Sequence, residues 1–391
     1  MPYDIDAFDT IRPYKKGEMK KALNDLLSDR HFQKLMQGYI PWLPKSFRNG
    51  LLRLAFIGLE EPQDFQVRYM NFIVKHFVVK KHTTSFTFDH EQIENNDTRY
   101  CFLSNHRDIV LDSALLDVLL IKEKFKRTVE IAIGDNLLIY PWIKALVRLN
   151  KSFTVRRGLS PRELLQSSQL MSEYIHFSLT QKHENLWIAQ REGRAKDSND
   201  ETQDSVLKML AMGGKGTPVE SLKELNIVPL TISYEYDPCD YLKAQEFQLK
   251  RDTPNYKKSK QDDLDNMRIG IFGDKGRVHY QASPCINTWI DQLADLPKTE
   301  LYTAVAKRID QDIHRSYKLF PGNYVACDML SGTTEFEAHY SSEEKKIFED
   351  YLKSRIELIN IPNKDVSFLQ ERILTMYANP VRNKLQAEQN K

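Results

Sequence analysis

The feature that most constrains the fold is an alternation of short apolar runs with helical segments through the middle of the chain. Five runs have the length and composition of buried strands: residues 100–104, 129–133, 153–155, 186–189 and 227–234. Three of the segments between them carry helical patterns: 112–121, 137–149 and 161–179. Alternation of this kind builds βαβ units, so we predict an α/β fold with a mostly parallel central sheet flanked by helices.

The segments on either side of this alternation give a provisional division of the chain. Residues 1–95 read mostly as helix, with a short strand-like stretch at 85–88, and residues 296–391 read as helix with a polar tail. We therefore predict a helical N-terminal region (1–95), a central domain (96–295) and a helical C-terminal region (296–391).

Two later segments of the central domain have patterns of their own. Residues 249–265 are highly charged and are expected to form a mobile excursion. The runs 268–272 and 277–282 then flank Gly273-Asp274-Lys275-Gly276 and are predicted to form a β-hairpin.

Composition excludes several classes of protein. The formal charge of the 391 residues is +2, so nothing global demands a nucleic-acid partner. The four cysteines are scattered without paired spacing, which argues against zinc and a disulfide framework and suits a reducing cytosol. No signal peptide and no run of about 18 apolar residues is present, so no membrane-spanning helix is expected.

The most informative stretch is Asn105-His106-Arg107-Asp108-Ile109-Val110-Leu111-Asp112, where an apolar strand runs into an apolar helix. Chemistry in α/β proteins is placed at strand ends, and a histidine oriented by a carboxylate is a general base near neutral pH. No serine or cysteine nucleophile stands out nearby, so the histidine would activate a substrate group. In isolation, a histidine near an aspartate at a helix start is more often part of a cap or a core hydrogen bond.

Two further segments place cations at strand ends. Arg156 and Arg157 follow a short strand, and paired guanidinium groups can fork onto a phosphate. In isolation, a solvated basic turn is the favoured interpretation of this pair. The Glu192-Gly193 turn is surrounded by three cations, Arg191, Arg194 and Lys196, which could hold an anion or form an ordinary turn. Val228 and Pro229 lie inside the apolar run 227–234, and by themselves they do not indicate a function.

The order of these four segments resembles the four blocks of the glycerol-3-phosphate and lysophosphatidate acyltransferase superfamily. The resemblance covers about residues 98–290, and it includes Lys275-Gly276-Arg277-Val278-His279-Tyr280 followed by Pro284-Cys285-Ile286. It implies a glycerolipid acyltransferase-like fold and an O-acyltransferase of phospholipid synthesis. The donor would be acyl-CoA or acyl-carrier protein, and the acceptor glycerol-3-phosphate or lysophosphatidate. No metal or other cofactor is implied.

The resemblance also assigns roles to residues. His106 would deprotonate the acceptor hydroxyl, which attacks the thioester carbonyl, and an acidic partner would orient His106. Cations of the blocks would bind substrate, with Arg156 and Arg194 on the acceptor phosphate. Glu192 and Gly193 would shape the turn, and Val228 and Pro229 would line the acyl or acceptor pocket. The remaining cations of this predicted set are Arg107, Arg157 and Lys196.

Two departures from the family pattern leave alternatives open. Five residues separate His106 from Asp112 where the family has four, and only one separates it from Asp108. The helix that follows favours Asp112, with Asp108 as the alternative. Arg194 follows Gly193 directly, so Arg191, Arg194 and Lys196 all remain candidates for the phosphate contact.

Lipid substrates imply contact with a bilayer, and we expect a cytoplasmic protein bound peripherally to the inner face of a membrane. Residues 137–149 have the composition of an interfacial helix and 51–57 are a second candidate, with core packing as the alternative for both. Other hypotheses are transfer to another lysolipid or an amino-acid lipid, or a catalytically silent lipid-binding protein. A polyanion-binding module is a weaker hypothesis, resting on the cations of blocks two and three with Lys151.

Overall fold

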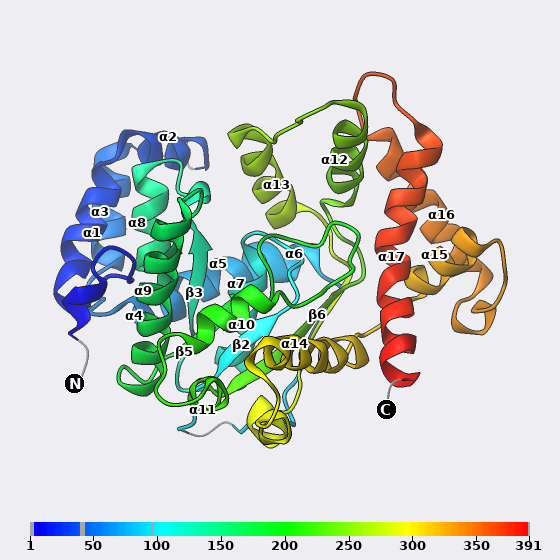
Figure 1. Ribbon diagram of the computed structural model, residues 1–391. Helices are drawn as coiled ribbons and strands as arrows, with labels where there is room; N and C mark the ends of the chain where they lie inside the picture. Colours follow the sequence, from blue (N-terminus) through cyan, green and yellow to red (C-terminus); the bar gives the residue numbers. More distant parts are fainter. Residues whose placement is uncertain (1–3, 40–43, 95–96, 390–391) are drawn as a thin grey trace.

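A seven-stranded sheet organises the protein. The computed structural model describes residues 4–39, 44–94 and 97–389 (Figure 1). The strands are ordered β1-β7-β6-β2-β5-β3-β4 across the sheet. Their bounds are β1 Ser85–Asp89, β2 Cys101–Ser104, β3 Val129–Gly134, β4 Ser152–Val155, β5 Asn185–Ala189, β6 Ile227–Tyr234 and β7 Arg277–Ala282.

The sheet is mostly parallel, as predicted. Strands β6, β2, β5, β3 and β4 run in one direction, with Cys101 of β2 opposite Ile227 of β6 and Leu186 of β5. Strand β7 is antiparallel to β6, and β1 pairs in parallel with β7 at the edge. Each of the five strands predicted from apolar runs is present within a residue or so of its predicted bounds.

Helices cover both faces of the sheet, and further helices come from the N- and C-terminal parts of the chain. The described residues before β1 and after residue 297 are mostly helical, whereas β1, within the predicted N-terminal region, belongs to the sheet. The bounds are α1 Met19–Ser28, α2 Arg30–Tyr39, α3 Lys45–Ala55, α4 Pro62–Phe65, α5 Asn71–Ile73, α6 Lys80–His82, α7 Leu111–Lys122, α8 Pro141–Leu149, α9 Pro161–Thr180, α10 Asp204–Ala211, α11 Pro218–Glu224, α12 Asp240–Asp252, α13 Lys260–Phe272, α14 Lys298–Arg315, α15 Pro321–Ser331, α16 Ser342–Glu357 and α17 Val366–Gln389.

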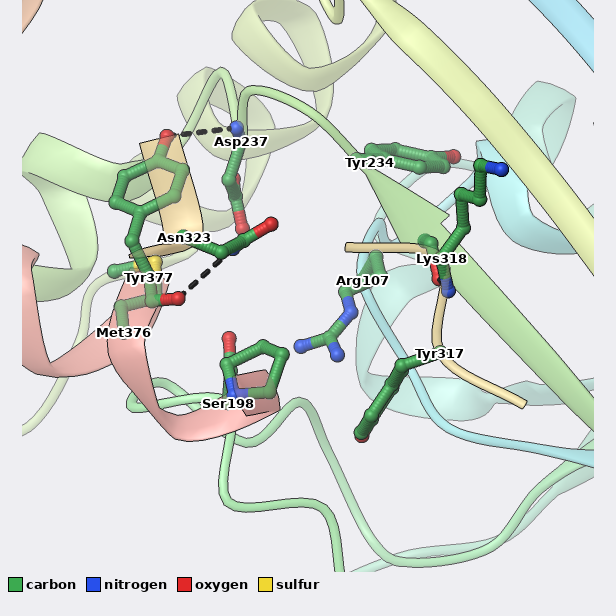
Figure 2. A pocket seen from close by; sticks show the side chains of 11 residues that line it. Arg107, Ser198, Tyr234, Asp237, Tyr317, Lys318, Asn323, Met376 and Tyr377 are labelled. Atoms are coloured by element: carbon green, nitrogen blue, oxygen red, sulfur yellow. Dashed lines mark hydrogen bonds between the residues drawn. The ribbon is translucent and has the colours of Figure 1, made fainter. Parts of the chain in front are cut away.

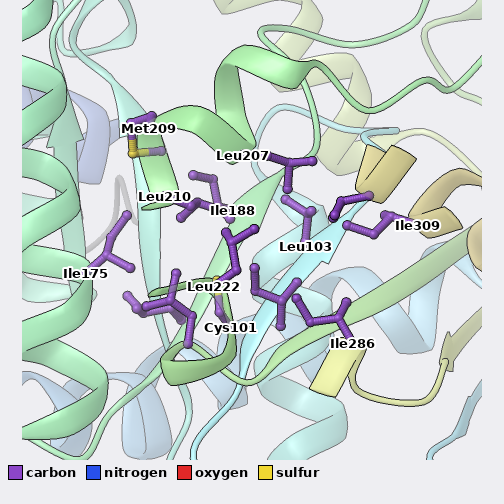
Figure 3. Close-up of a cluster of buried hydrophobic side chains, with 14 of the residues drawn as sticks. Cys101, Leu103, Ile175, Ile188, Leu207, Met209, Leu210, Leu222, Ile286 and Ile309 are labelled. Atoms are coloured by element: carbon purple, nitrogen blue, oxygen red, sulfur yellow. The ribbon is translucent and has the colours of Figure 1, made fainter. Parts of the chain in front are cut away.

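Alternate residues of the central strands serve two separate cores. Cys101 and Leu103 of β2 pack with α9, α10 and α14 on one face (Figure 3). Phe102 belongs to the core on the other face, where α7 buries ten consecutive residues, 111–120. A strand buried on both faces has no polar side to alternate with, which explains the continuous apolar runs in the sequence.

The segment that packs on α7 is a single helical run with unusual geometry. Residues 62–82, called the 62–82 helix below, comprise α4, α5 and α6 joined by π-helical stretches at Gln66–Met70 and Val74–Val79. Val74 and Val78 enter the α7 core. No helix in the described part of the chain is both long enough and apolar enough to cross a membrane.

One prediction about residues 249–282 is wrong. The charged stretch 249–265 contains the end of α12 and the start of α13, joined by residues 253–259, but 268–272 is the end of α13 rather than the first strand of a hairpin. The Ser259 side chain and Asp262 form a capping box that starts α13, and this decides helix over strand for the residues that follow. Only β7 of the predicted hairpin is a strand. The predicted boundary between residues 95 and 96 falls outside the described residues.

Helix α13 lies close to the loop after β2 at Gly270. A β-carbon at this position would lie 2.0 Å from Asp108 Oδ2, in the loop that follows β2. Such a contact is far inside van der Waals distance, so either α13 or the loop would have to move. Glycine at 270 therefore lets α13 lie directly on the loop that carries His106.

We expect Gly270→Ala to lower the free energy of unfolding by about 1–3 kcal/mol, because a methyl group added to a packed contact forces strain. Urea unfolding would measure the change. Gly17→Ala is the matched control, since a β-carbon there meets nothing within 4 Å. Equal unfolding midpoints for the two variants would contradict the close approach.

Candidate active site

The predicted site segments meet at one edge of the sheet. His106 follows β2, the Arg191–Arg194 turn follows β5, and Arg156 and Arg157 follow β4. These strands are parallel, so their carboxyl ends share an edge, and β5 is hydrogen-bonded directly to β2. The structure thus brings blocks one, two and three of the predicted set to the same side of the molecule.

The acidic partner of His106 is Asp112. Its Oδ2 atom lies 2.8 Å from His106 Nδ1 and accepts the Arg107 backbone N–H at 2.7 Å. The Asp108 backbone N–H also points at this carboxylate, at 3.1 Å. The carboxylate only accepts, so Nδ1 donates to it and Nε2 is left as the basic nitrogen of the ring.

Asp108 has a different role. Its Oδ1 atom accepts the backbone N–H groups of Val110 and Leu111, both at 2.8 Å, at the start of α7. Burial raises the pKa of the Asp108 carboxyl, and the charge of Asp112 adds to the effect. Asp108 therefore caps the helix and makes no hydrogen bond to His106, which decides the alternative that the spacing left open.

The environment of His106 differs from that of a second buried histidine. The His106 side chain is 14% exposed, lies edge-on to the Trp187 ring at 5.7 Å, and its Nε2 has no partner among the described residues. His176 also pairs with a carboxylate, Glu224, but its Nε2 lies 2.9 Å from the Leu210 carbonyl oxygen. A carbonyl oxygen only accepts hydrogen bonds, so Nε2 of His176 must carry a hydrogen and cannot act as a base. Nε2 of His106 faces no such acceptor in the described part of the chain and is available.

The loop around His106 is fixed by its neighbours on both sides. The Asn105 side chain brackets the backbone of Ile232 in β6, accepting from its N–H at 2.8 Å and donating to its carbonyl at 3.0 Å. Tyr234 donates its hydroxyl to Asp112 Oδ1 at 3.3 Å, and burial raises the Tyr234 pKa well above its usual value. The tyrosine therefore stays protonated as a donor to the carboxylate.

Arg107, predicted to bind substrate, is anchored inside the protein, although its Nη1 has no partner among the described residues. Its Nη2 lies 2.7 Å from Asp200 Oδ2, which also accepts the Tyr317 hydroxyl at 2.6 Å. Burial alone would lower the Arg107 pKa, but the charge of Asp200 reverses this and the pKa is raised. Figure 2 shows the guanidinium within a cavity of about 30 Å³ that Ser198 and residues of α17 also line.

Two predicted cations of the turn after β5 are engaged by the α12–α13 segment. Arg194 Nη2 donates to Asn266 Oδ1 of α13 at 3.1 Å. Lys196 forms an ion pair with Glu246 of α12, and burial lowers the pKa of Lys196 to about 8. Of these two, Arg194 keeps a free donor, because its Nη1 is buried without a partner among the described residues.

The arginines after β4 point in different directions. Arg156 is exposed, whereas Arg157 forms an ion pair with Glu192 of the neighbouring turn. Gly193, in that turn, has φ of +72°, the left-handed conformation that glycine tolerates. Arg157 Nε and Arg191 Nε are further buried donors without a partner in the described part of the chain. Unpartnered guanidinium nitrogens are what an anionic ligand would satisfy.

Val228 and Pro229 do not reach the site. They lie opposite Phe102 and Leu103 within the sheet, and Val228 is fully buried in the α7 core. Pro229 immediately precedes the part of β6 that pairs with β7, and it accepts the Ser283 N–H at 2.9 Å. This explains how a proline is tolerated in an interior strand.

Sequence reasoning missed the residues that hold the site in place. Asp200, Tyr234 and Asn266 come from a loop, a strand end and α13, and none stands in a recognisable motif. Their roles depend on contacts between residues more than 70 positions apart, such as Arg194 with Asn266. No group of three or more His, Cys, Asp or Glu side chains in the described residues is placed to hold a metal ion.

Comparison with known proteins adds no relative: no protein-family model matches the chain, and no curated protein gives a significant match.

We expect the buried Arg107–Asp200 ion pair to contribute to the stability of the fold. We expect Arg107→Met to lower the free energy of unfolding by about 3–5 kcal/mol, because it leaves a buried carboxylate uncompensated. Arg251→Met is the control, since the Arg251–Asp365 pair is 40% exposed on each side and solvent screens its attraction, so its loss should change stability little. Equal unfolding midpoints in urea would show that Arg107 does not hold the loop.

Proposed function

We propose that the protein is an O-acyltransferase that moves a fatty acyl group from a thioester to the hydroxyl of a phosphate-bearing glycerol or lysolipid. The observation that carries the proposal is the His106–Asp112 pair at the carboxyl end of β2, with Nε2 of the imidazole free. The order of the four segments in the sequence supports the same class of reaction. We also propose that the α/β fold is of the glycerolipid acyltransferase type.

The reaction that this geometry supports needs one base and no protein nucleophile. Nε2 of His106 takes the proton of the acceptor hydroxyl as its oxygen attacks the thioester carbonyl. The tetrahedral intermediate collapses, the carbon–sulfur bond breaks, and the leaving thiolate takes the proton from His106. An ester forms, a thioester is consumed, and the enzyme returns to its starting state. Asp112 orients the imidazole and stabilises its charged form.

The cations that follow β4 and β5, at the same edge of the sheet as His106, suggest why the acceptor carries a phosphate. Arg194 follows the strand next to β2, and its Nη1 is a buried donor without a partner among the described residues. Arg157 and Arg191 each present a buried Nε in the same condition. Guanidinium groups match the geometry of phosphate oxygens, so these three side chains are the proposed phosphate ligands.

Two other functions remain alternatives. Transfer to another lysolipid or to an amino-acid lipid would use the same base and differ only in the acceptor. A catalytically silent lipid-binding protein was motivated by the longer spacing between His106 and Asp112. The 2.8 Å hydrogen bond favours a catalytic role, because the extra residue does not disturb the pair.

Removing the base should abolish transfer. We expect His106→Ala to lower kcat by about 100- to 10,000-fold, the usual contribution of a general base. The assay offers acyl-CoA and acyl-carrier protein with glycerol-3-phosphate and with lysophosphatidate. His90→Ala is the control, since His90 also lies near a carboxylate, Glu123, but follows β1 rather than β2.

The same assay tests the choice of partner. Asp112→Asn should cost much more activity than Asp108→Asn, because an asparagine at 108 can still accept the two N–H groups at the start of α7. Full activity in His106→Ala would refute the mechanism. Thioester consumption by none of the four pairs of substrates would favour another acceptor or the silent lipid-binding protein.

The phosphate contact predicts a change in KM. We expect Arg194→Ala to raise KM for a phosphate-bearing acceptor by about 10- to 100-fold, the loss of a charged hydrogen bond. Arg162→Ala, at an exposed position of α9, should leave KM unchanged. An unchanged KM in Arg194→Ala would assign the phosphate to Arg157 and Arg191 instead.

A further inference from the structure

Helix α3 carries an apolar stripe that faces away from the protein. Phe47, Leu51 and Leu54 are spaced so that they share one side of the helix, and they are 59%, 46% and 65% exposed. Ile57, just beyond the helix, is 69% exposed. Large apolar side chains are common singly on surfaces, but a row of this kind indicates a surface that is covered in use.

The opposite side of this segment is attached to the protein. Phe56 packs edge-on against Tyr69 of the 62–82 helix at 5.2 Å and also meets Phe65. A β-carbon on Gly58 would lie 3.6 Å from Arg68 of the same helix. The end of α3 therefore packs on the 62–82 helix. The segment has one packed side, and the apolar stripe is on its exposed side.

The 62–82 helix continues the apolar character. Phe72, Ile73 and Phe77 are 53%, 45% and 47% exposed, while Val74 and Val78 face the core. The π-helical stretches place about one more residue in each turn, so Phe72 and Phe77, five residues apart, stay on the same outer side. Lys81 lies over the Phe77 ring at 5.2 Å, which puts a cation beside the exposed ring.

Basic residues outnumber acidic ones in these two segments. Residues 30–59 contain five Lys or Arg and no Asp or Glu, and residues 65–82 contain four Lys or Arg and no Asp or Glu. The acids Glu60, Glu61 and Asp64 lie between these stretches, where Glu60 pairs with Lys16 and Glu61 with Arg127. The whole chain is nearly neutral, with 56 basic and 54 acidic residues. The local excess of basic residues makes this part of the surface cationic as well as apolar.

The other candidate for bilayer contact is partly covered by the protein. Trp142 and Leu146 of α8 pack against the cluster formed by α1, and Phe32 of α2 approaches Trp142 at 6.1 Å. Most of residues 137–149 are half-buried, and Leu149 is fully buried. The apolar surface formed by residues 47–57 has no such partner in the described part of the chain.

We infer that α3 and the outer side of the 62–82 helix form the surface that binds an anionic lipid bilayer. The inference deepens the proposed function, on which the choice of a lipid partner rests. The docking surface is defined by Phe47, Leu51, Leu54, Phe72, Ile73 and Phe77. The apolar side chains enter the boundary between headgroups and acyl chains, and the surrounding cations contact anionic headgroups.

A second copy of the chain fits this surface less well. Two such surfaces placed face to face would bring together an excess of cations, and like charges repel. An anionic bilayer supplies both the apolar interior and the opposite charge. Charge complementarity therefore selects the bilayer over self-association.

The test is co-sedimentation of the full-length protein with vesicles. Phosphatidylcholine vesicles with and without about one third phosphatidylglycerol separate the electrostatic part of binding from the apolar part. The variants are Leu54→Glu and Phe77→Glu, singly and together, at exposed positions where the fold should tolerate them. Leu165→Glu is the matched control, because Leu165 is 62% exposed on α9, far from the docking surface in the sequence.

We expect each variant to weaken binding to the anionic vesicles by about tenfold or more, with Leu165→Glu like the wild type. Binding of the wild type should fall as salt rises and be weaker on neutral vesicles. Equal binding by the double variant and the wild type would overturn the inference. A dimer in light scattering that Leu54→Glu converts to monomer would overturn it too, in favour of a second copy.

The experiment separates this inference from the enzymatic proposal. Vesicle binding is measured without turnover, so His106→Ala should bind vesicles like the wild type. If vesicle binding depends on Leu54 and Phe77 but the protein transfers no acyl group, the docking surface is supported and the proposed reaction is refuted. Acyl transfer by a protein whose vesicle binding does not depend on Leu54 or Phe77 would support the proposed reaction and contradict the docking surface.

Discussion

The interaction on which the site depends is the set of hydrogen bonds to the Asp112 carboxylate. Two backbone N–H groups, the Tyr234 hydroxyl and His106 Nδ1 all converge on it. Asp112 lies in the first turn of α7, a helix buried along ten consecutive residues, so the carboxylate has no freedom to turn away. A weak acid held in this way sets the orientation of the imidazole, and the loop between β2 and α7 takes its shape from the same contacts.

The C-terminal helical region reaches this loop from the other side. Tyr317, between α14 and α15, holds Asp200, and Asp200 holds Arg107, the residue next to His106. Residues of α17 line the cavity that contains the Arg107 guanidinium (Figure 2). The helices after residue 296 therefore belong to the support of the site, even though none of the proposed reacting groups lies on them.

Much of the fold could be predicted because each central strand is buried on both faces and appears as a short apolar run. For the partner of His106, the sequence favoured Asp112 but left Asp108 open, since the two carboxylates lie four residues apart and the hydrogen bonds of the folded loop are needed to separate them. Residues 268–272 alternate like a strand, but the cap at Ser259, nine residues earlier, makes them helical. Arg107 and Asp200 are 93 positions apart, and no local pattern announces their ion pair.

Strand β1 has a consequence for how the protein can be divided. It comes from residues 85–89, ahead of the central βαβ units, yet it forms five register pairs with β7 and is the edge strand on that side of the sheet. Without it, the backbone of β7 would become the unpaired edge, and such edges recruit other chains into aggregates. A shortened chain that begins after β1 would therefore expose a strand that is interior in the full-length protein.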